Sequence, residues 1–359
     1  MRNSQLAVLC GVIVLAALVI AGATMMVGRS IREEIANSGG GGGSGSPGPN
    51  AAGGGQSRGK KLTVAVMPKS KGNAYFIACK KGADAAAAEL GVKMIWDAPT
   101  ESNAEQQKQI VDRWVTQRVD AISVAVEDAG VLSDALARAR AAGIKVVTWD
   151  SDARPDARDF FCNQGTDEGI GDTLLKTANE QMGGEGEFVI ISGTQSAANL
   201  TAWRKRIQSQ LSKYPKLKLL EVQYCDDLRD RAAAIGREML IKHAKLKLIM
   251  AICSPAVPGA AEAVERSNRK DVKVIGLGLP NENKPFVHKG LTQAVILWKT
   301  EDLGYLAVQA AKAVADGSLA PGATEFECGR LGKLRIEGTS VILGEPFVFT
   351  KENIDQFDF

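Results

Sequence analysis

The sequence predicts an α/β protein of two lobes, each built around a parallel β-sheet. Apolar, β-rich runs alternate with helical patterns from about residue 61 onward. These runs are continuously apolar, which is typical of strands that helices cover on both faces, as in parallel sheets. The runs are also too numerous for one open sheet of this type, so two sheets accommodate them better.

The expected strands lie at 62–67, 92–96, 121–126, 145–149, 188–192, 217–224, 246–252, 272–277 and 292–298. The expected helices lie between them, at 76–90, 104–117, 131–142, 170–182, 199–213, 229–244, 256–267 and 303–315. Glycines end several of these helices, at Gly91, Gly143 and Gly183. Helix 303–315 follows the last strand and is expected to return to the first lobe.

We expect residues 61–163 and 293–324 to form the N-terminal lobe, and residues 164–292 and 325–359 to form the C-terminal lobe. Chain crossings near 163–164, 291–298 and 321–328 would then make a three-segment hinge. Two lobes joined by such a hinge can close around a ligand.

Residues 1–28 are predicted to be a signal peptide or a membrane anchor. The uncharged run 6–28 is long enough to cross a bilayer, for which about 20 apolar residues suffice. Cleavage after Ala21-Gly22-Ala23 would satisfy the small-x-small rule of secretory signals. Residues 29–60 are rich in Gly and Ser and are expected to be a flexible linker, which favours the anchor because a tether needs one. On either alternative the domain is exported to the periplasm or the extracytoplasmic face, tethered or secreted.

Composition excludes several classes of function. The net charge of +3 is spread thinly, which gives no support to nucleic-acid binding. The six cysteines lie far apart without a C-x-x-C pair, which indicates neither a disulfide framework nor a zinc site. Gly276-Leu277-Gly278 lacks a third glycine, and Pro280 is expected to prevent a helix there, so no dinucleotide fingerprint is present. We therefore expect no enzyme, no cofactor and no metal.

Two strand-end loops carry the polar residues that point to function. The first, 66–76, contains Lys69, Asn73 and Phe76, and the second, 147–152, contains Asp150 and Asp152. Loops at strand ends of open α/β sheets border the crevices where small ligands bind. A carboxylate accepts hydrogen bonds from hydroxyls, Lys and Asn donate to the same oxygens, and an aromatic ring packs on the apolar face of a sugar. The loops predict a protein that holds a small polar molecule.

An ordered set of motifs resembles the periplasmic sugar-binding proteins of ABC importers, in the branch of rhamnose-binding and autoinducer-2-binding proteins. The motifs are Val66-Met67-Pro68-Lys69, Gly72-Asn73 with Tyr75-Phe76, Thr148-Trp149-Asp150-Ser151-Asp152, Asn163-Gln164-Gly165-Thr166, Leu297-Trp298 and the closing segment 351–359. The resemblance implies a type I periplasmic binding fold of two Rossmann-like lobes. It also implies a non-enzymatic role, in which ligand is captured outside the cell and delivered to a membrane permease.

The resemblance assigns roles to several positions. Lys69 matches a lysine that donates to ligand oxygens, Phe76 an aromatic that packs on the ligand ring, and Asp150 a carboxylate that accepts from adjacent hydroxyls. Asn199 and Ser254 stand where the autoinducer-2 branch carries Asp and Ala, which argues against autoinducer-2 itself. Lys299 replaces a smaller polar residue, which suggests an acidic or more heavily hydroxylated ligand.

The candidate ligand-binding residues are Lys69, Asn73, Phe76, Asp150, Asp152, Asn199, Ser254, Trp298 and Lys299. Alternatives remain at several of them: Asn73 can serve its turn, Asp152 can order its loop, and Trp298 can plug the hinge. Tyr75, Trp149 and Trp203 are expected mainly to pack in the core.

The predicted function is capture of a monosaccharide or small polyol between two lobes for an ABC transporter permease, by a monomer. The alternative is sensing, in which the closed form is presented to a membrane sensor kinase or chemoreceptor.

Overall fold

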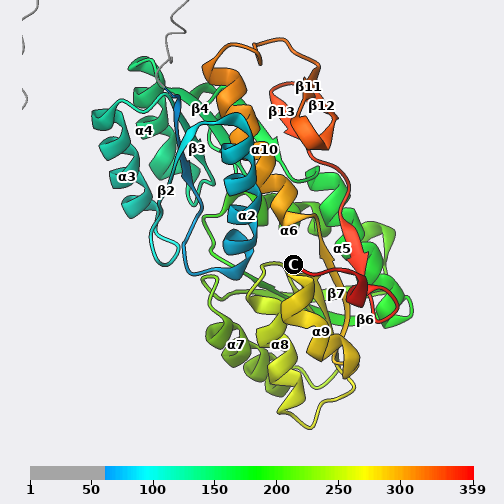
Figure 1. The fold of residues 1–359 in the computed structure, drawn as a ribbon. Coiled ribbons are helices and arrows are strands. Elements are labelled where there is room, and N and C mark those ends of the chain that lie inside the picture. The colour runs from blue at the N-terminus through cyan, green and yellow to red at the C-terminus, as the bar shows by residue number, and fades with distance from the viewer. Residues whose placement is uncertain (1–60) are drawn as a thin grey trace, which may run out of the picture. The chain divides into compact units, whose positions relative to one another are not determined.

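The computed structural model describes residues 61–359, which form two lobes, each with a central sheet (Figure 1). The predicted signal peptide or anchor at 1–28 and the predicted linker at 29–60 lie outside the described residues. Within 61–359, no helix combines the length and the apolar character that crossing a bilayer requires.

The first lobe contains an eight-stranded sheet. Its first five strands are β1 (Thr63–Met67), β2 (Lys93–Trp96), β3 (Ala121–Val124), β4 (Lys145–Trp149) and β5 (Phe160–Asn163). The last three are β11 (Glu325–Glu327), β12 (Lys333–Glu337) and β13 (Ser340–Ile342). The order across the sheet is β11-β12-β13-β5-β4-β3-β1-β2, and all neighbours from β13 to β2 are parallel. Only β12 runs antiparallel to its neighbours.

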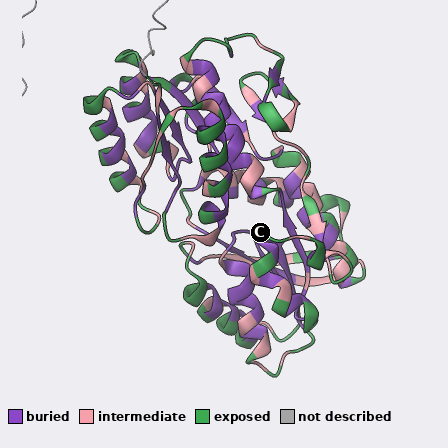
Figure 2. Ribbon diagram, in the orientation of Figure 1, coloured by how far each residue is buried: buried purple, intermediate pink, exposed green. Residues whose placement is uncertain are grey.

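Helices cover both faces of this sheet. One face carries α2 (Ala74–Leu90) and α10 (Thr300–Ala315), and the other carries α3 (Ala104–Gln117) and α4 (Ala129–Ala141). Successive residues of β1 serve the two faces: Val64 and Val66 lie in the core with α2, and Ala65 and Met67 in the core with α3 and α4. This double burial (Figure 2) is the reason why the strands are continuously apolar.

The second lobe contains a six-stranded sheet in the order β14-β10-β9-β8-β6-β7. Its strands are β6 (Gly186–Ser192), β7 (Leu217–Tyr224), β8 (Leu246–Ala251), β9 (Lys273–Leu277), β10 (Thr292–Leu297) and β14 (Phe347–Phe349). Its helices are α5 (Asp167–Met182), α6 (Ala198–Gln210), α7 (Arg229–Lys242), α8 (Ala256–Glu265) and α9 (Pro280–His288). Helix α5 packs on α6, and α7 and α9 both pack on α8. Only β14 is antiparallel to its neighbour.

The chain crosses between the sheets three times. The crossings lie between β5 and α5, between β10 and α10, and between β13 and β14. Two predicted boundaries are therefore wrong. Strand β10 belongs to the second sheet rather than to an N-terminal segment starting at 293, and residues 325–342 belong to the first sheet rather than the second. The chain extends the edge of the first sheet after α10 before it crosses, which no apolar run in the sequence revealed.

Helix α10 returns to the first lobe, as predicted, and packs closely against α2. Two glycines permit this approach. A Cβ at Gly82 would lie 1.7 Å from the Glu301 carbonyl oxygen, and a Cβ at Gly304 would lie 1.9 Å from the Cys79 carbonyl oxygen. Both contacts are far below van der Waals separation, so the two backbones meet where side chains are missing. The contact holds α2 against α10 (Figure 1), and Tyr75 and Phe76 in the first turn of α2 line the cavity described below.

Several elements were not predicted. Strand β5 and the short strands β11 to β14 are missing from the expected set, and α9 contradicts the expectation that Pro280 prevents a helix. Pro280 is the first residue of α9. At that position the missing N–H costs nothing, because the first N–H groups of a helix have no partner within it.

Candidate functional site

A cavity of about 420 Å³, including its opening to solvent, lies between the lobes at the carboxyl ends of the strands. The first lobe contributes Lys69, Asn73, Tyr75, Phe76 and Asp150. The second lobe contributes Asn199, Leu200, Trp203, Asp227, Ile252, Cys253, Ser254, Leu277 and Leu297, and Trp298 stands at the second crossing.

Polar side chains of the first lobe form a connected network. The Trp298 indole N–H donates to the Tyr75 hydroxyl at 3.0 Å, and the Tyr75 hydroxyl donates to Asp150 Oδ1 at 2.8 Å. Lys69 Nζ lies 3.5 Å from Asp150 Oδ2. Lys69 and Asp150 are each only 4% exposed, so the ion pair is almost fully desolvated. A buried pair of this kind orients its members firmly, because each is costly to leave alone.

The backbone at Asp150 is itself unusual. Asp150 follows β4 directly and has φ of +63°, in the left-handed region that residues other than glycine rarely adopt. Asp227, in the loop between β7 and α7, has φ of +56°. Such conformations cost free energy and persist where the surrounding structure imposes them, often at functional sites. Both aspartates line the cavity.

Two contacts join the lobes across the cavity. Lys69 Nζ donates to Asn199 Oδ1 at 3.0 Å, and Asn199 Nδ2 donates to Asp150 Oδ2 at 3.4 Å. Outside the cavity lining, a third contact joins the lobes: the Thr194 hydroxyl donates to Glu127 Oε1 at 2.5 Å. Thr194 follows β6 of the second lobe, and Glu127 follows β3 of the first. The structure is therefore a closed arrangement of the two lobes.

Burial and charge together set the protonation of these groups. Burial alone would lower the pKa of Lys69. The negative charges of Asp150, Glu127 and Asp227 outweigh this effect and raise the pKa, so Lys69 is protonated. Burial raises the pKa of Asp150, and the nearby Lys69 opposes that rise. Burial also raises the pKa of Asp227 to about 6, against the opposing effect of Lys69.

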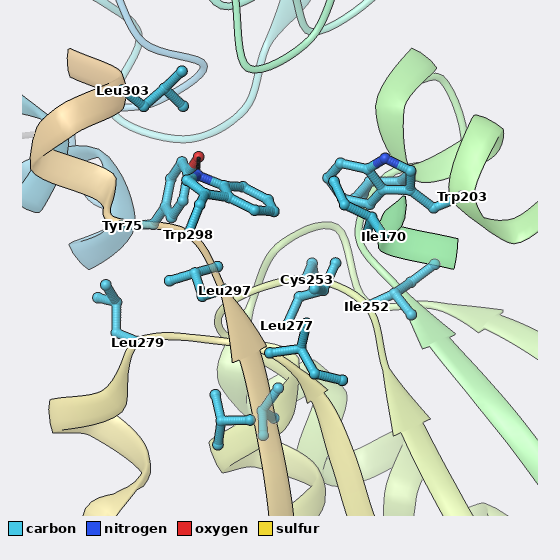
Figure 3. Packing of buried hydrophobic residues seen from close by; sticks show 14 of the residues in the cluster. Tyr75, Ile170, Trp203, Ile252, Cys253, Leu277, Leu279, Leu297, Trp298 and Leu303 are labelled. Atoms are coloured by element: carbon cyan, nitrogen blue, oxygen red, sulfur yellow. Dashed lines mark hydrogen bonds between the residues drawn. The ribbon is translucent and has the colours of Figure 1, made fainter. Parts of the chain in front are cut away.

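The second lobe presents an apolar wall, which consists of Leu200, Trp203, Ile252, Leu277 and Leu297. Figure 3 shows Trp203 and Trp298 facing each other, with Ile252, Cys253 and Leu277 below them in this view, and all five residues line the cavity. The rings of Trp203 and Trp298 lie 5.9 Å apart between centroids. Such a wall suits the C–H face of a sugar ring or a methyl substituent.

Ser254 adds a polar group to this side of the cavity. Its hydroxyl oxygen is buried and has no protein hydrogen-bond partner. Buried polar atoms are nearly always paired, so this hydroxyl is suited to a ligand or a water molecule.

Seven of the nine candidate residues meet at this cavity: Lys69, Asn73, Phe76, Asp150, Asn199, Ser254 and Trp298. The structure does not bring Asp152 there. Asp152 pairs with Arg158 at 2.6 Å and accepts from Thr148, so it orders the loop after β4. Lys299 is exposed and lines a separate surface hollow with Arg330. The suggestion of an acidic ligand, which depended on Lys299, therefore loses its basis.

Sequence reasoning missed part of the site. Tyr75 and Trp203, expected mainly to pack, line the cavity as well, and Asp227 was not considered. Asp227 lies three residues after the end of the predicted strand 217–224, in the pair Asp226-Asp227, so its place near a strand end was the available signal. Within residues 61–359, no group of three or more His, Cys, Asp or Glu side chains is arranged to hold a metal ion.

Comparison with known proteins shows the family. A periplasmic binding protein domain matches residues 64–319. The chain belongs to the periplasmic binding protein family. The sequence-based resemblance and the predicted two-lobe fold are thereby confirmed.

Relatives of this periplasmic binding protein include the ribose import binding protein of Bacillus subtilis, 24% identical over 72% of this chain and 83% of the relative. The D-allose-binding periplasmic protein of Escherichia coli is 26% identical over 67% of this chain and 80% of its own length. Among solved structures, an ABC transporter solute-binding protein of Clostridium phytofermentas with bound L-rhamnose has a TM-score of 0.80 and 28% identity, over 83% of this chain and 98% of that one. An autoinducer-2 complex from Clostridium saccharobutylicum has a TM-score of 0.78 and 26% identity, over 83% and 100%.

Proposed function

We propose that this periplasmic binding protein captures a neutral monosaccharide or small polyol between its lobes and delivers it to an ABC transporter permease, without catalysis. The polar network that spans the cavity carries the proposal. Lys69, Asp150 and Asn199 offer both donors and acceptors at one place, which suits the vicinal hydroxyls of a sugar.

The balance of charge at the cavity favours a neutral ligand. One ammonium, Lys69, faces two carboxylates, Asp150 and Asp227. An acidic sugar would add a further negative charge to a site from which water is largely excluded, and it would be repelled there. The apolar wall favours a ligand with few hydroxyls on one side, such as a deoxyhexose or a pentose.

The ligand would take over contacts that the lobes now make with each other. Hydroxyls that reach Lys69 and Asp150 would replace the amide of Asn199, and the Ser254 hydroxyl would gain a partner. Binding would then hold the lobes closed by filling the space between them, which shifts the balance from the open to the closed form.

We further propose that the domain acts outside the cytoplasm as a monomer, held to the membrane by an uncut segment within residues 1–28. The Gly/Ser-rich stretch after that segment supports a tether. Intact-mass measurement of the protein from the membrane fraction tests this, because cleavage would remove the first 23 residues, through Ala23.

Thermal-shift screening of the full-length protein identifies the ligand, because a ligand that binds only the native state raises the melting temperature. The panel is L-rhamnose, D-arabinose, D-ribose, D-allose and xylitol, with D-glucuronate as the acidic counterpart. We expect a neutral sugar to give the largest shift and calorimetry to confirm one site. No shift with any neutral sugar or polyol, or a larger shift with glucuronate, contradicts the proposal.

Co-purification distinguishes transport from sensing. A tagged protein carrying bound ligand should retain an ABC permease after mild cross-linking. Recovery of a sensor kinase or chemoreceptor in its place would support the sensing alternative.

A further inference from the structure

Two cysteines of the second lobe meet beside the cavity. Cys225 follows β7 directly, and Cys253 lies two residues beyond β8. Their sulfurs are 3.6 Å apart, and both residues are buried. Cys253 lines the cavity (Figure 3). The sequence gives no sign of this pair, because 27 residues separate the two cysteines.

The register of the sheet explains why the sulfurs meet. Strand β6 lies between β7 and β8, with Ser192 level with Tyr224 and Ile191 level with Ala251. Continued past the strand ends, both registers place a cysteine level with Gly193. Neighbouring residues at one level of a parallel sheet point to the same face. At Gly193 itself a Cβ would lie 2.5 Å from Asp227 Oδ1 and 2.8 Å from Leu200 Cδ1, so a larger residue would not fit between the two loops.

We propose that Cys225 and Cys253 form a disulfide in the exported protein, which ties together the two loops that carry Asp227 and Ser254. The inference goes beyond sugar binding and does not depend on which ligand binds. Formation of the bond would bring the sulfurs from 3.6 Å to the bonded distance of about 2 Å. Because β6 separates β7 from β8, the two loops must also bring the cysteine Cα atoms to within about 7 Å of each other, the limit for a disulfide. Both cysteines lie past the ends of their strands, and oxidising extracytoplasmic compartments preserve such bonds.

The oxidation needs a disulfide as co-reactant, supplied by a thiol–disulfide oxidoreductase in the cell or by oxidised glutathione in the test tube. One cysteine thiolate attacks the donor disulfide and releases one donor thiol, which leaves a mixed disulfide. The second cysteine, as its thiolate, attacks the protein sulfur of that mixed disulfide and releases the second donor thiol. The protein loses two hydrogen atoms, and the donor disulfide is reduced to two thiols.

We expect the bond to form before the lobe is fully folded. The hydrogen bond with Cys225, followed by burial, raises the pKa of the Cys253 thiol well above its ordinary value. The thiolate is the attacking species, so exchange in the folded protein is slow. An unfolded or partly folded chain exposes both thiols to the oxidant.

Peptide mapping tests the proposal directly. The full-length protein is exported, purified without reductant, denatured, treated with a thiol-blocking reagent and digested. We expect a peptide containing Cys225 to be joined to one containing Cys253, with Cys79, Cys162 and Cys328 blocked as free thiols. Blocked thiols at both Cys225 and Cys253 overturn the proposal.

Refolding provides a second measurement with a matched control. Reduced protein refolded with reduced and oxidised glutathione should form the same link, and so should the Cys79→Ala variant, which leaves the pair intact. The oxidised form should melt a few degrees above the reduced form. Cys225→Ser should abolish both the link and this difference. A difference that survives in Cys225→Ser excludes the disulfide as its cause.

Discussion

The two lobes border the same cavity with different chemistry. The first lobe presents a hydrogen-bonded, charged network that is complete before any ligand arrives. The second presents mainly apolar side chains, with a few separate polar groups among them. The contrast teaches that the two lobes contribute differently to ligand recognition. The first lobe binds ligand hydroxyls with charged groups that are already in place, and the second selects the ligand by its shape and apolar surface.

The largest expected effect comes from breaking the first-lobe network at Asp150. Asp150→Asn removes the partner of the buried Lys69 ammonium and should weaken sugar binding about 100-fold or more, because an unpaired buried charge is costly. Isothermal calorimetry with the identified sugar measures this loss.

Asp152→Asn is the matched control. It removes a carboxylate of the same loop that pairs with Arg158 and lies outside the cavity. This variant should have a lower melting temperature than the wild type and should bind the sugar nearly as tightly. Equal losses of affinity in the two variants would mean that loop order, and not direct contact, explains the effect.

The apolar wall should have a smaller influence. Leu277→Ala removes a side chain from the cavity surface and should weaken binding about tenfold, by the apolar contact that it takes away. Leu279→Ala removes a buried leucine two residues further on that does not line the cavity. It should lower the melting temperature and leave affinity unchanged. A ligand that binds Leu277→Ala at full strength does not use this wall.

The contact between Glu127 and Thr194 sharpens the comparison, because it joins the lobes outside the cavity lining. Thr194→Val removes the hydroxyl and should favour the open form, which lowers affinity about three- to tenfold. Small-angle scattering without ligand should show a larger radius of gyration than the wild type does. Thr201→Val, which removes an exposed hydroxyl bonded within its own lobe, serves as the control. An unchanged radius of gyration in Thr194→Val would mean that the Glu127–Thr194 contact does not help to hold the lobes closed.

Substitution of Asp227 should give the smallest effect, which is a change in how the stability of the protein depends on pH. Its pKa is raised from 3.8 to about 6 in the folded protein, so folding favours the protonated form. The stabilisation is fully present below pH 3.8 and is lost as the pH rises through about 6. Asp227→Asn should therefore gain melting temperature relative to the wild type at pH 7 but not at pH 3.5. A difference in melting temperature between variant and wild type that is the same at pH 3.5 and pH 7 would contradict the raised pKa of Asp227.

Much of the fold could be predicted from the sequence, because helices cover both faces of the long parallel strands. Lys69 and Asp150 could be predicted as neighbours because Lys69 lies two residues beyond β1 and Asp150 directly follows β4. The short strands at 325–349 could not be predicted, since each is three to five residues long and has little apolar surface to mark it.

Other parts of the site depend on tertiary contacts. Trp298 was an open choice between wall and hinge plug, and it proves to stand at a crossing and line the cavity as well. Asp152 and Asp150 have the same residue type in the same loop, and only the position of Arg158 separates their roles. The meeting of Cys225 with Cys253 depends on strand order, which composition does not carry.

The position of Trp298 makes it an intrinsic fluorescent reporter of lobe movement. Its indole N–H is bonded to Tyr75 while its ring borders the space that a sugar would fill. Because the residue lies where the chain passes from one lobe to the other, movement of the lobes must change the polarity around the ring. Ultraviolet-excited emission can thus follow the opening and closing of the protein in real time, without any attached dye.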